Sequence, residues 1–63
     1  MADNKIEFYR KKAGLSRREL AERTGVSEFC IQEWALDRHQ PRVFNAICLA
    51  QALGTTVEEL FSP

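Results

Sequence analysis

Apolar residues recur at spacings of three and four positions along most of the chain, which is the pattern of helices that each bury one face. In the first such segment, this spacing places Ile6, Tyr9 and Ala13 on the inward face. Asn4 precedes the segment and is a candidate cap, because its side-chain oxygen can accept a hydrogen bond from a free backbone N–H group. We therefore predict a first helix over residues 5–13.

Two more helices are predicted from start signals that stand close together in the sequence. Ser16 and Glu19 have the spacing of a capping box, in which a hydroxyl and a carboxylate each accept a hydrogen bond from the other residue's backbone N–H group. Gly25 then supplies the backbone freedom that a sharp turn needs, and Ser27 is the candidate cap of the next helix. The expected helices cover residues 17–24 and 28–36.

The last two helices are predicted over residues 43–53 and 57–61. The longer one is expected to bury the face that carries Val43, Ile47, Ala50 and Leu53. Its start lacks the usual serine or threonine, because Arg42 occupies the position of the cap. Thr56 and Glu59 form a second candidate capping box, which starts the short final helix.

Two short helices joined by a turn of about four residues that contains a glycine are a candidate helix-turn-helix. The positions that carry the pattern are Leu15-Ser16, Glu19-Leu20-Ala21, Gly25-Val26-Ser27, Ile31, Trp34, Gln40-Pro41, Leu49-Ala50, Ala52-Leu53-Gly54 and Glu59-Leu60-Phe61. Together they closely resemble the Xre-type family of DNA-binding domains, to which phage repressors and Cro belong. The resemblance covers roughly residues 6–61 and keeps the family's spacing without a gap.

This resemblance implies an all-α fold, a compact five-helix lambda-repressor-like bundle that forms a single helix-turn-helix domain over residues 1–63. It also implies a function. The family consists of sequence-specific transcriptional regulators of the Xre/Cro repressor type, found in prokaryotes and phages. Their third helix reads the major groove of operator double-stranded DNA, commonly as a homodimer.

The composition excludes several other classes of protein. A chain of 63 residues, 44% of them hydrophobic, can build one small core. It has no apolar run near the ~20 residues that span a bilayer and no signal peptide at its start, so we expect a cytoplasmic protein. Cys30 and Cys48 lack the spacing of a metal site, and we expect two reduced thiols. His39 is the only histidine and has no catalytic partners, so neither catalysis, a metal nor a cofactor is expected.

Charge is the feature that least favours DNA binding. Nine basic and nine acidic residues cancel, and a neutral domain starts with little of the affinity that comes from neutralising phosphates. The cations are nevertheless grouped, with Arg10, Lys11, Lys12, Arg17 and Arg18 in one run and Arg38, His39 and Arg42 in a weaker one. Such runs are usually solvated surface. The family resemblance favours a role in DNA binding for Arg17 and Arg38.

By analogy with the family, the residues that face the major groove are Ser27, Glu28, Phe29, Gln32 and Glu33. Contacts with the DNA backbone are expected from Arg17, Arg38, His39 and Arg42. Two acids and a large aromatic residue are unusual here, because family members often carry small, polar or basic residues. Glutamate can nevertheless accept from cytosine N4, glutamine can pair with adenine, and phenylalanine can pack on a thymine methyl group. A carboxylate about 4 Å from a phosphate is repelled by roughly 1 kcal/mol in water.

The chain departs from the family in two further ways. Asp37 stands where many members have a glycine after the third helix, although aspartate tolerates a left-handed backbone. Phe8, Phe29, Leu36 and Phe44 are apolar where members are commonly polar, and an apolar patch is typical of a surface that binds a partner. The alternative function is therefore a helix-turn-helix fold diverted to protein binding through Phe29, Leu36 and Phe44. DNA binding predicts a steep fall of affinity with salt, whereas an apolar interface predicts a weak one.

Overall fold

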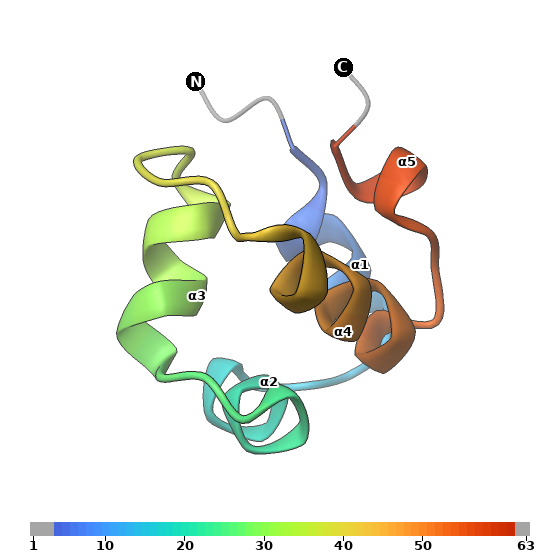
Figure 1. The fold of residues 1–63 in the computed structure, drawn as a ribbon. Coiled ribbons are helices and arrows are strands. Elements are labelled where there is room, and N and C mark those ends of the chain that lie inside the picture. Colours follow the sequence, from blue (N-terminus) through green and yellow to red (C-terminus); the bar gives the residue numbers. More distant parts are fainter. Residues whose placement is uncertain (1–3, 62–63) are drawn as a thin grey trace.

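Helices supply all the regular secondary structure between residues 4 and 61, the part of the chain that the computed structural model describes (Figure 1). They are α1 (Ile6–Lys12), α2 (Arg17–Thr24), α3 (Glu28–Ala35), α4 (Val43–Leu53) and α5 (Val57–Phe61). The expected all-α bundle of five helices is therefore confirmed. Each helix within residues 4–61 is too short or too polar to cross a membrane.

The turn between α2 and α3 is built from the local bonds that the sequence predicts. At the start of α2, the Glu19 backbone N–H donates to the Ser16 hydroxyl at 3.0 Å, and the Ser16 backbone N–H donates to the Glu19 carboxylate at 2.9 Å. Gly25 ends α2 with a φ of 76°, a left-handed conformation that favours glycine. The Ser27 hydroxyl then accepts from the Cys30 N–H at 3.1 Å. The capping box therefore fixes the start of α2, Gly25 ends it, and the Ser27 bond fixes the start of α3.

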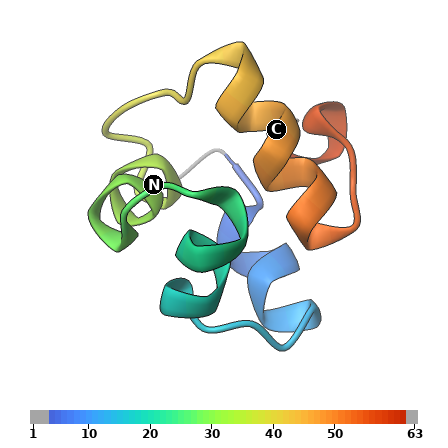
Figure 2. The ribbon, with the colours of Figure 1, turned by 60° about the horizontal axis from the view of Figure 1, so that its bottom comes forward.

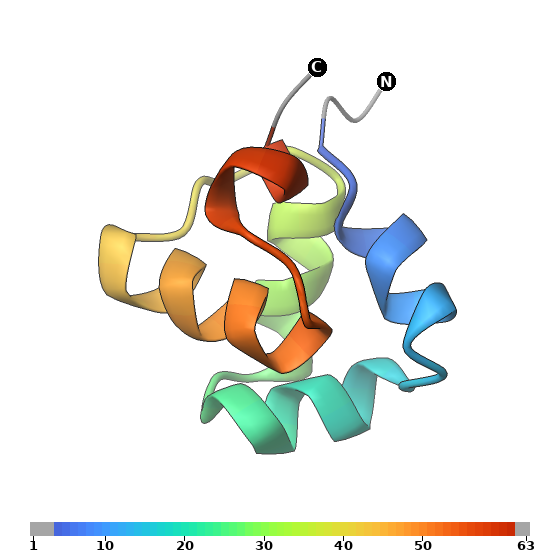
Figure 3. The same ribbon diagram turned by 90° about the vertical axis from the view of Figure 1, so that its right-hand side faces the viewer.

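The core lies where all five helices meet. Each helix contributes one of the large side chains that are completely buried, namely Ile6, Leu20, Ile31, Leu49 and Leu60. α2 packs on α3 and α4, α5 packs on α4, and α1 packs on α3 and α5. Figure 2 shows α3, in light green, at one edge of the bundle, and Figure 3 shows α2 lying across the bottom. One side of α3 is therefore free of other helices.

α1 is shorter than the predicted first helix. Ala13 is its exposed C-cap rather than part of the inward stripe, because the chain already turns toward α2 there. Lys5 holds the N-cap position without a side-chain bond, and the Asn4 side-chain oxygen accepts from the Ile6 N–H at 3.2 Å. The Asn4 amide also donates to the Trp34 carbonyl at 2.7 Å. Asn4 therefore ties the start of α1 to the end of α3.

The buried face of α4 agrees with the predicted one at Ala50 and Leu53 but not at Val43 and Ile47. Its buried residues are Ala46, Leu49, Ala50 and Leu53. Val43 and Ile47, which the spacing placed inward, are 77% and 43% exposed. The prediction was wrong for these two residues because α4 is apolar on nearly every side, so spacing alone does not identify the buried face. The packing of α2 and α5 decides it.

Candidate nucleic-acid interface

The exposed surface of the helix-turn-helix is centred on the first turn of α3. Ser27 and Glu28 are exposed, and Phe29 has 66% of its surface open to solvent. Gln32 is half-buried and lies one turn further along, so it neighbours both Glu28 and Phe29 on the helix surface. The structure therefore places four of the five residues expected to face a groove close together, at the N-cap and in the first turns of α3, which lies at the left edge of Figure 1. We call these four residues, Ser27, Glu28, Phe29 and Gln32, the open stretch of α3.

Glu33, the fifth of these residues, is not part of the open stretch. Its side chain is only 10% exposed, and its carboxylate accepts from Nη1 of Arg38 at 3.2 Å. The other carboxylate oxygen lies 3.8 Å from Nε2 of His39, a side chain that is charged only when protonated. The loop after α3 folds back over Glu33 in this way, so the carboxylate faces that loop. Glu33 therefore lies apart from the four exposed or half-buried residues, and its contact with a base stays a prediction that its burial does not favour.

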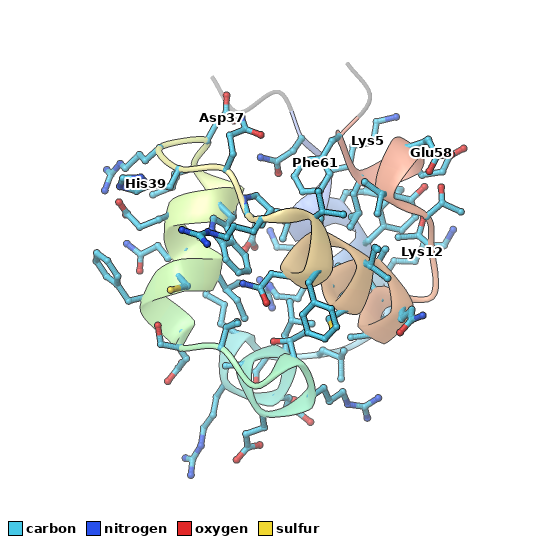
Figure 4. All side chains as sticks on the ribbon, in the orientation of Figure 1. Lys5, Lys12, Asp37, His39, Glu58 and Phe61 are labelled. Atoms are coloured by element: carbon cyan, nitrogen blue, oxygen red, sulfur yellow. The ribbon has the colours of Figure 1, made fainter. Side chains whose placement is uncertain are left out.

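The loop reaches Glu33 through a left-handed turn. Asp37 has a φ of 60°, the conformation for which aspartate is tolerated in place of glycine. This turn directs the N–H groups of Arg38 and His39 back to the Glu33 carbonyl, at 2.9 and 3.4 Å. Figure 4 shows Asp37 and His39 on the loop at the end of α3.

The four residues expected to contact the DNA backbone come from different elements, and all four are exposed. Arg17 is the first residue of α2, and its Nε lies 3.4 Å from the Glu7 carboxylate of α1. Arg38 and His39 belong to the loop after α3 and share Glu33 as a partner. Arg42 stands at the N-cap of α4 and makes no side-chain cap bond. The structure thus brings Arg38 and His39 together, while Arg17 has a separate acidic partner.

The run of cations in α1 and α2 does not form one patch. Arg10 is held by Glu7, whose carboxylate lies 2.6 Å from the guanidinium. The Lys12 amine lies 5.9 Å from the ring centres of both Phe8 and Tyr9, within the range of a cation–π contact. Figure 4 shows Lys12 on the side of the molecule away from α3. Arg10 thus shares Glu7 with Arg17, whereas Lys12 contacts aromatic rings of α1 away from α3.

Two acids close to these cations have lowered pKa values. The hydrogen bond from the Arg10 side chain holds the pKa of Glu7 below its ordinary 4.5; the charges of Arg10 and Arg17 add to this, and partial burial opposes it. The backbone N–H of Ser16, followed by its hydroxyl, lowers the pKa of Glu19. Both carboxylates are therefore ionised at neutral pH and cancel part of the positive charge around the start of α2.

A second exposed surface is apolar and lies at the start of α4. Within residues 4–61, the large apolar side chains that are exposed are Phe8, Phe29, Leu36, Val43, Phe44 and Ile47. The last three neighbour one another on α4, and we call them the α4 apolar surface. Val43 also borders a hollow of about 290 Å³, which is lined by Gln40, Pro41, Ala46, Val57 and Phe61. The sequence pattern missed Val43 and Ile47 because it assigned them to the core.

The chemistry that these surfaces offer is recognition. Within the described part of the chain, no three His, Cys, Asp or Glu residues are placed to hold a metal ion. Cys30 and Cys48 are half-buried free thiols. His39 is accompanied by an acid and an arginine, a set that holds a loop in place and lacks a nucleophile. These surfaces therefore offer a ligand hydrogen-bonding groups, charges and apolar rings.

Comparison with known proteins gives a match over nearly the whole chain. A family model described as helix-turn-helix, HTH_3, matches residues 6–60. The chain is also similar to a protein of Methanothermobacter thermautotrophicus named as an uncharacterized HTH-type transcriptional regulator. The two are 39% identical over 57 residues, which cover 89% of this chain and 83% of the relative.

Two solved structures of DNA complexes have a similar fold. The P22 c2 repressor in complex with a synthetic operator superposes with a TM-score of 0.82 and 28% identity, over 86% of this chain and 82% of the repressor chain. SinR, a master regulator of biofilm formation, was solved in complex with DNA. It superposes with a TM-score of 0.80 and 27% identity, over 92% of this chain and 94% of the SinR chain.

Proposed function

Since the chain belongs to the helix-turn-helix family HTH_3 and is a DNA-binding transcriptional regulator of the Xre type, we propose that it binds operator DNA as a homodimer through the start of α3. The family and the fold are those of DNA-binding regulators and not of enzymes. The observation that carries the proposal is the open stretch of α3, which follows two capped helix starts and a left-handed glycine. Such a regulator works where its DNA is, which for a prokaryotic or phage protein is the cytoplasm.

Each residue of the open stretch has a base that it can recognise in the major groove. The Glu28 carboxylate can accept from cytosine N4, the Gln32 amide can pair with adenine, and the Phe29 ring can pack on a thymine methyl group. Ser27 can donate or accept through its hydroxyl. A good contact of this kind discriminates between bases by ~1–3 kcal/mol. The predicted operator therefore contains cytosine, adenine and thymine under α3.

The phosphate contacts are proposed for Arg17, Arg38, His39 and Arg42. All four side chains are exposed, and Arg42 precedes the N-terminus of α4, where free N–H groups also favour an anion. Each phosphate that a cation neutralises makes the salt slope steeper by about 0.9. Acidic partners reduce this attraction, since Glu7 faces Arg17 and Glu33 faces Arg38. We therefore expect modest affinity for DNA of arbitrary sequence.

The homodimer is proposed to form through the α4 apolar surface. This surface and the adjoining hollow contain no charged side chain. In a two-fold dimer the same patch of each copy meets its counterpart, so a surface without charge avoids repulsion between like residues. Sedimentation of the protein with and without operator DNA tests this step, and Ile47→Asp is expected to weaken the dimer without changing the exposed part of α3.

A second function is supported by a different observation, the exposure of Phe29 on α3 and of Leu36 at its C-cap. Together with Phe44 they offer apolar anchors that a protein partner could bury. The salt dependence of binding separates the two functions. An apolar protein interface gives nearly the same affinity at low and high salt, whereas DNA binding does not.

The test of the proposed function is a titration of the wild-type protein with duplex DNA of mixed sequence at several salt concentrations. We expect log K to fall linearly with log salt, with a slope set by the number of phosphate contacts. A duplex selected from a random pool is then expected to bind more tightly than the mixed duplex at every salt concentration. Absence of binding at low salt would favour the protein-binding function.

A further inference from the structure

Glu33 is buried although it carries a charge. Between residues 4 and 61 it is the only polar or charged residue that is buried. A buried carboxylate is costly unless it is paired, and this one is paired with Arg38 through a hydrogen bond of 3.2 Å. The pair spans the left-handed turn at Asp37, so it links the end of α3 to the loop that follows. The cost of burial is thus offset by a partner that lies outside the helix.

The Arg38 side chain has N–H donors that Glu33 does not use. It uses Nη1 for Glu33, while 61% of the side chain remains open to solvent. A guanidinium carries five N–H donors in a fixed fork, so it can hold a carboxylate with one part and meet a phosphate with another. The backbone N–H groups of Arg38 and His39 are fastened to the Glu33 carbonyl as well. Both the chain and the side chain of Arg38 are therefore held by one residue.

We propose that Glu33 is a positioning residue, which holds Arg38 and the loop after α3 in the orientation from which the guanidinium meets a phosphate. This inference rests on the proposed phosphate contact of Arg38. By holding Arg38, Glu33 raises the affinity for DNA, although its negative charge by itself lowers that affinity. An acid near DNA repels phosphates, so a purely electrostatic view predicts tighter binding when Glu33 is neutralised. Positioning predicts weaker binding.

The two views predict changes of DNA affinity in opposite directions, so the affinity of Glu33 variants distinguishes them. Affinity for duplex DNA of mixed sequence is measured against salt for the wild type, Glu33→Gln, Glu28→Gln and Glu58→Gln. Each variant removes one negative charge; Glu28 is exposed on the same helix, and Glu58 is exposed on α5, on the opposite side of Figure 4 from α3. The glutamine oxygen can still accept one hydrogen bond, but the ionic attraction that holds the guanidinium is lost. We therefore expect Glu33→Gln to bind more weakly, by up to about eightfold at ~0.1 M salt, and its slope to fall by up to about 0.9, the effect of one lost phosphate contact. Glu28→Gln should bind more tightly and Glu58→Gln like the wild type.

Arg38→Gln separates failure of the inference from failure of the proposed function. If Arg38→Gln leaves the salt slope unchanged, Arg38 makes no phosphate contact and that part of the proposed function is wrong. If Arg38→Gln lowers the slope but Glu33→Gln does not, only the positioning role is overturned. In the double variant, no further loss beyond that of Arg38→Gln supports positioning, and independent additive losses contradict it.

Glu33→Asp covers the case in which the glutamine variant does not fold. Aspartate keeps the charge but is shorter by one methylene, so its oxygens are drawn back from Arg38. Positioning predicts weaker binding and a lower salt slope for this variant, with a thermal midpoint that shows it to be folded. Wild-type affinity and slope in folded Glu33→Asp would overturn the inference, because charge would then be all that matters at this position.

Discussion

Ser16 and Glu19 each accept a hydrogen bond from the other's backbone N–H group, at 3.0 and 2.9 Å. The reciprocal pair satisfies two of the N–H groups that every helix start leaves without a partner. Arg17 follows Ser16 directly and is the first residue of α2, so the cap that starts the helix also sets the position of a proposed phosphate contact. The stability of α2 and the proposed phosphate contact of Arg17 thus involve the same cap.

Loss of this cap is expected to destabilise the whole domain. Ser16→Ala removes the hydroxyl that accepts from the Glu19 N–H, and such a loss costs ~1 kcal/mol, a large share of the stability of a domain this small. Chemical denaturation measures the effect, with Ser16→Thr as the control that keeps a hydroxyl. Equal midpoints for Ser16→Ala and the wild type would mean that α2 does not depend on this cap.

Acid is expected to remove a contribution that Glu7 makes to stability. Its pKa is lower in the folded protein than its ordinary 4.5, mainly through the hydrogen bond from Arg10, so its contribution is complete above that value and is lost as the pH falls through the lowered pKa. Glu7→Gln should therefore be less stable at neutral pH, by no more than ~1 kcal/mol for a partly exposed pair. The difference from the wild type should shrink in acid. A difference that stays constant from pH 7 into acid would contradict this linkage.

The helix starts and the turn could be predicted from the sequence because they are decided by near neighbours. Ser16, Gly25 and Ser27 act on residues within one helical turn, and their roles follow from hydrogen-bonding groups and backbone freedom alone. Asp37 was predictable for the same reason, since few residues besides glycine adopt its left-handed conformation. Local chemistry was therefore enough to locate the helix-turn-helix.

The buried face of α4 and the role of Glu33 could not be predicted in this way. α4 is apolar on nearly every side, so the helices packed on it decide that Ala46 is buried while Val43 is exposed. Glu33 follows Gln32 in α3 and looks equally polar, but the loop folds back on it and Arg38 covers its carboxylate. Both outcomes depend on contacts between different segments, and the spacing of residues along one helix gives no information about such contacts.

Arg17 is expected to contribute affinity without contributing specificity. Arg17→Ala should weaken binding to all DNA sequences alike and reduce the salt slope by about 0.9. Arg18→Ala is the matched control, because it removes the same charge from the next residue, whose side chain is 80% exposed and lies 4.0 Å from the Glu22 carboxylate. A smaller change is expected for Arg18→Ala. A loss confined to one sequence would show that Arg17 reads a base.

Neutralising Glu28 is expected to raise the affinity for DNA and to lower the specificity for one base. Glu28→Gln keeps a hydrogen-bond acceptor but removes a charge that phosphates repel, so binding to mixed DNA should become tighter. The amide can also donate, which should weaken any preference for cytosine. Binding to a panel of duplexes that differ at single base pairs measures both effects. A change of affinity and specificity in the same direction would contradict the proposed contact.

The central claim is that the open stretch of α3 reads the operator, and Phe29→Ala tests it most directly. The measurement is the ratio of affinities for a duplex selected by the wild type and for a mixed duplex, at two salt concentrations. Phe8→Ala is the control, since it removes a ring of similar exposure from α1. We predict that Phe29→Ala lowers the ratio, by an amount equivalent to ~1–3 kcal/mol of binding free energy, while Phe8→Ala leaves it unchanged. An unchanged ratio in Phe29→Ala, together with loss of a protein association that salt does not affect, would contradict the claim.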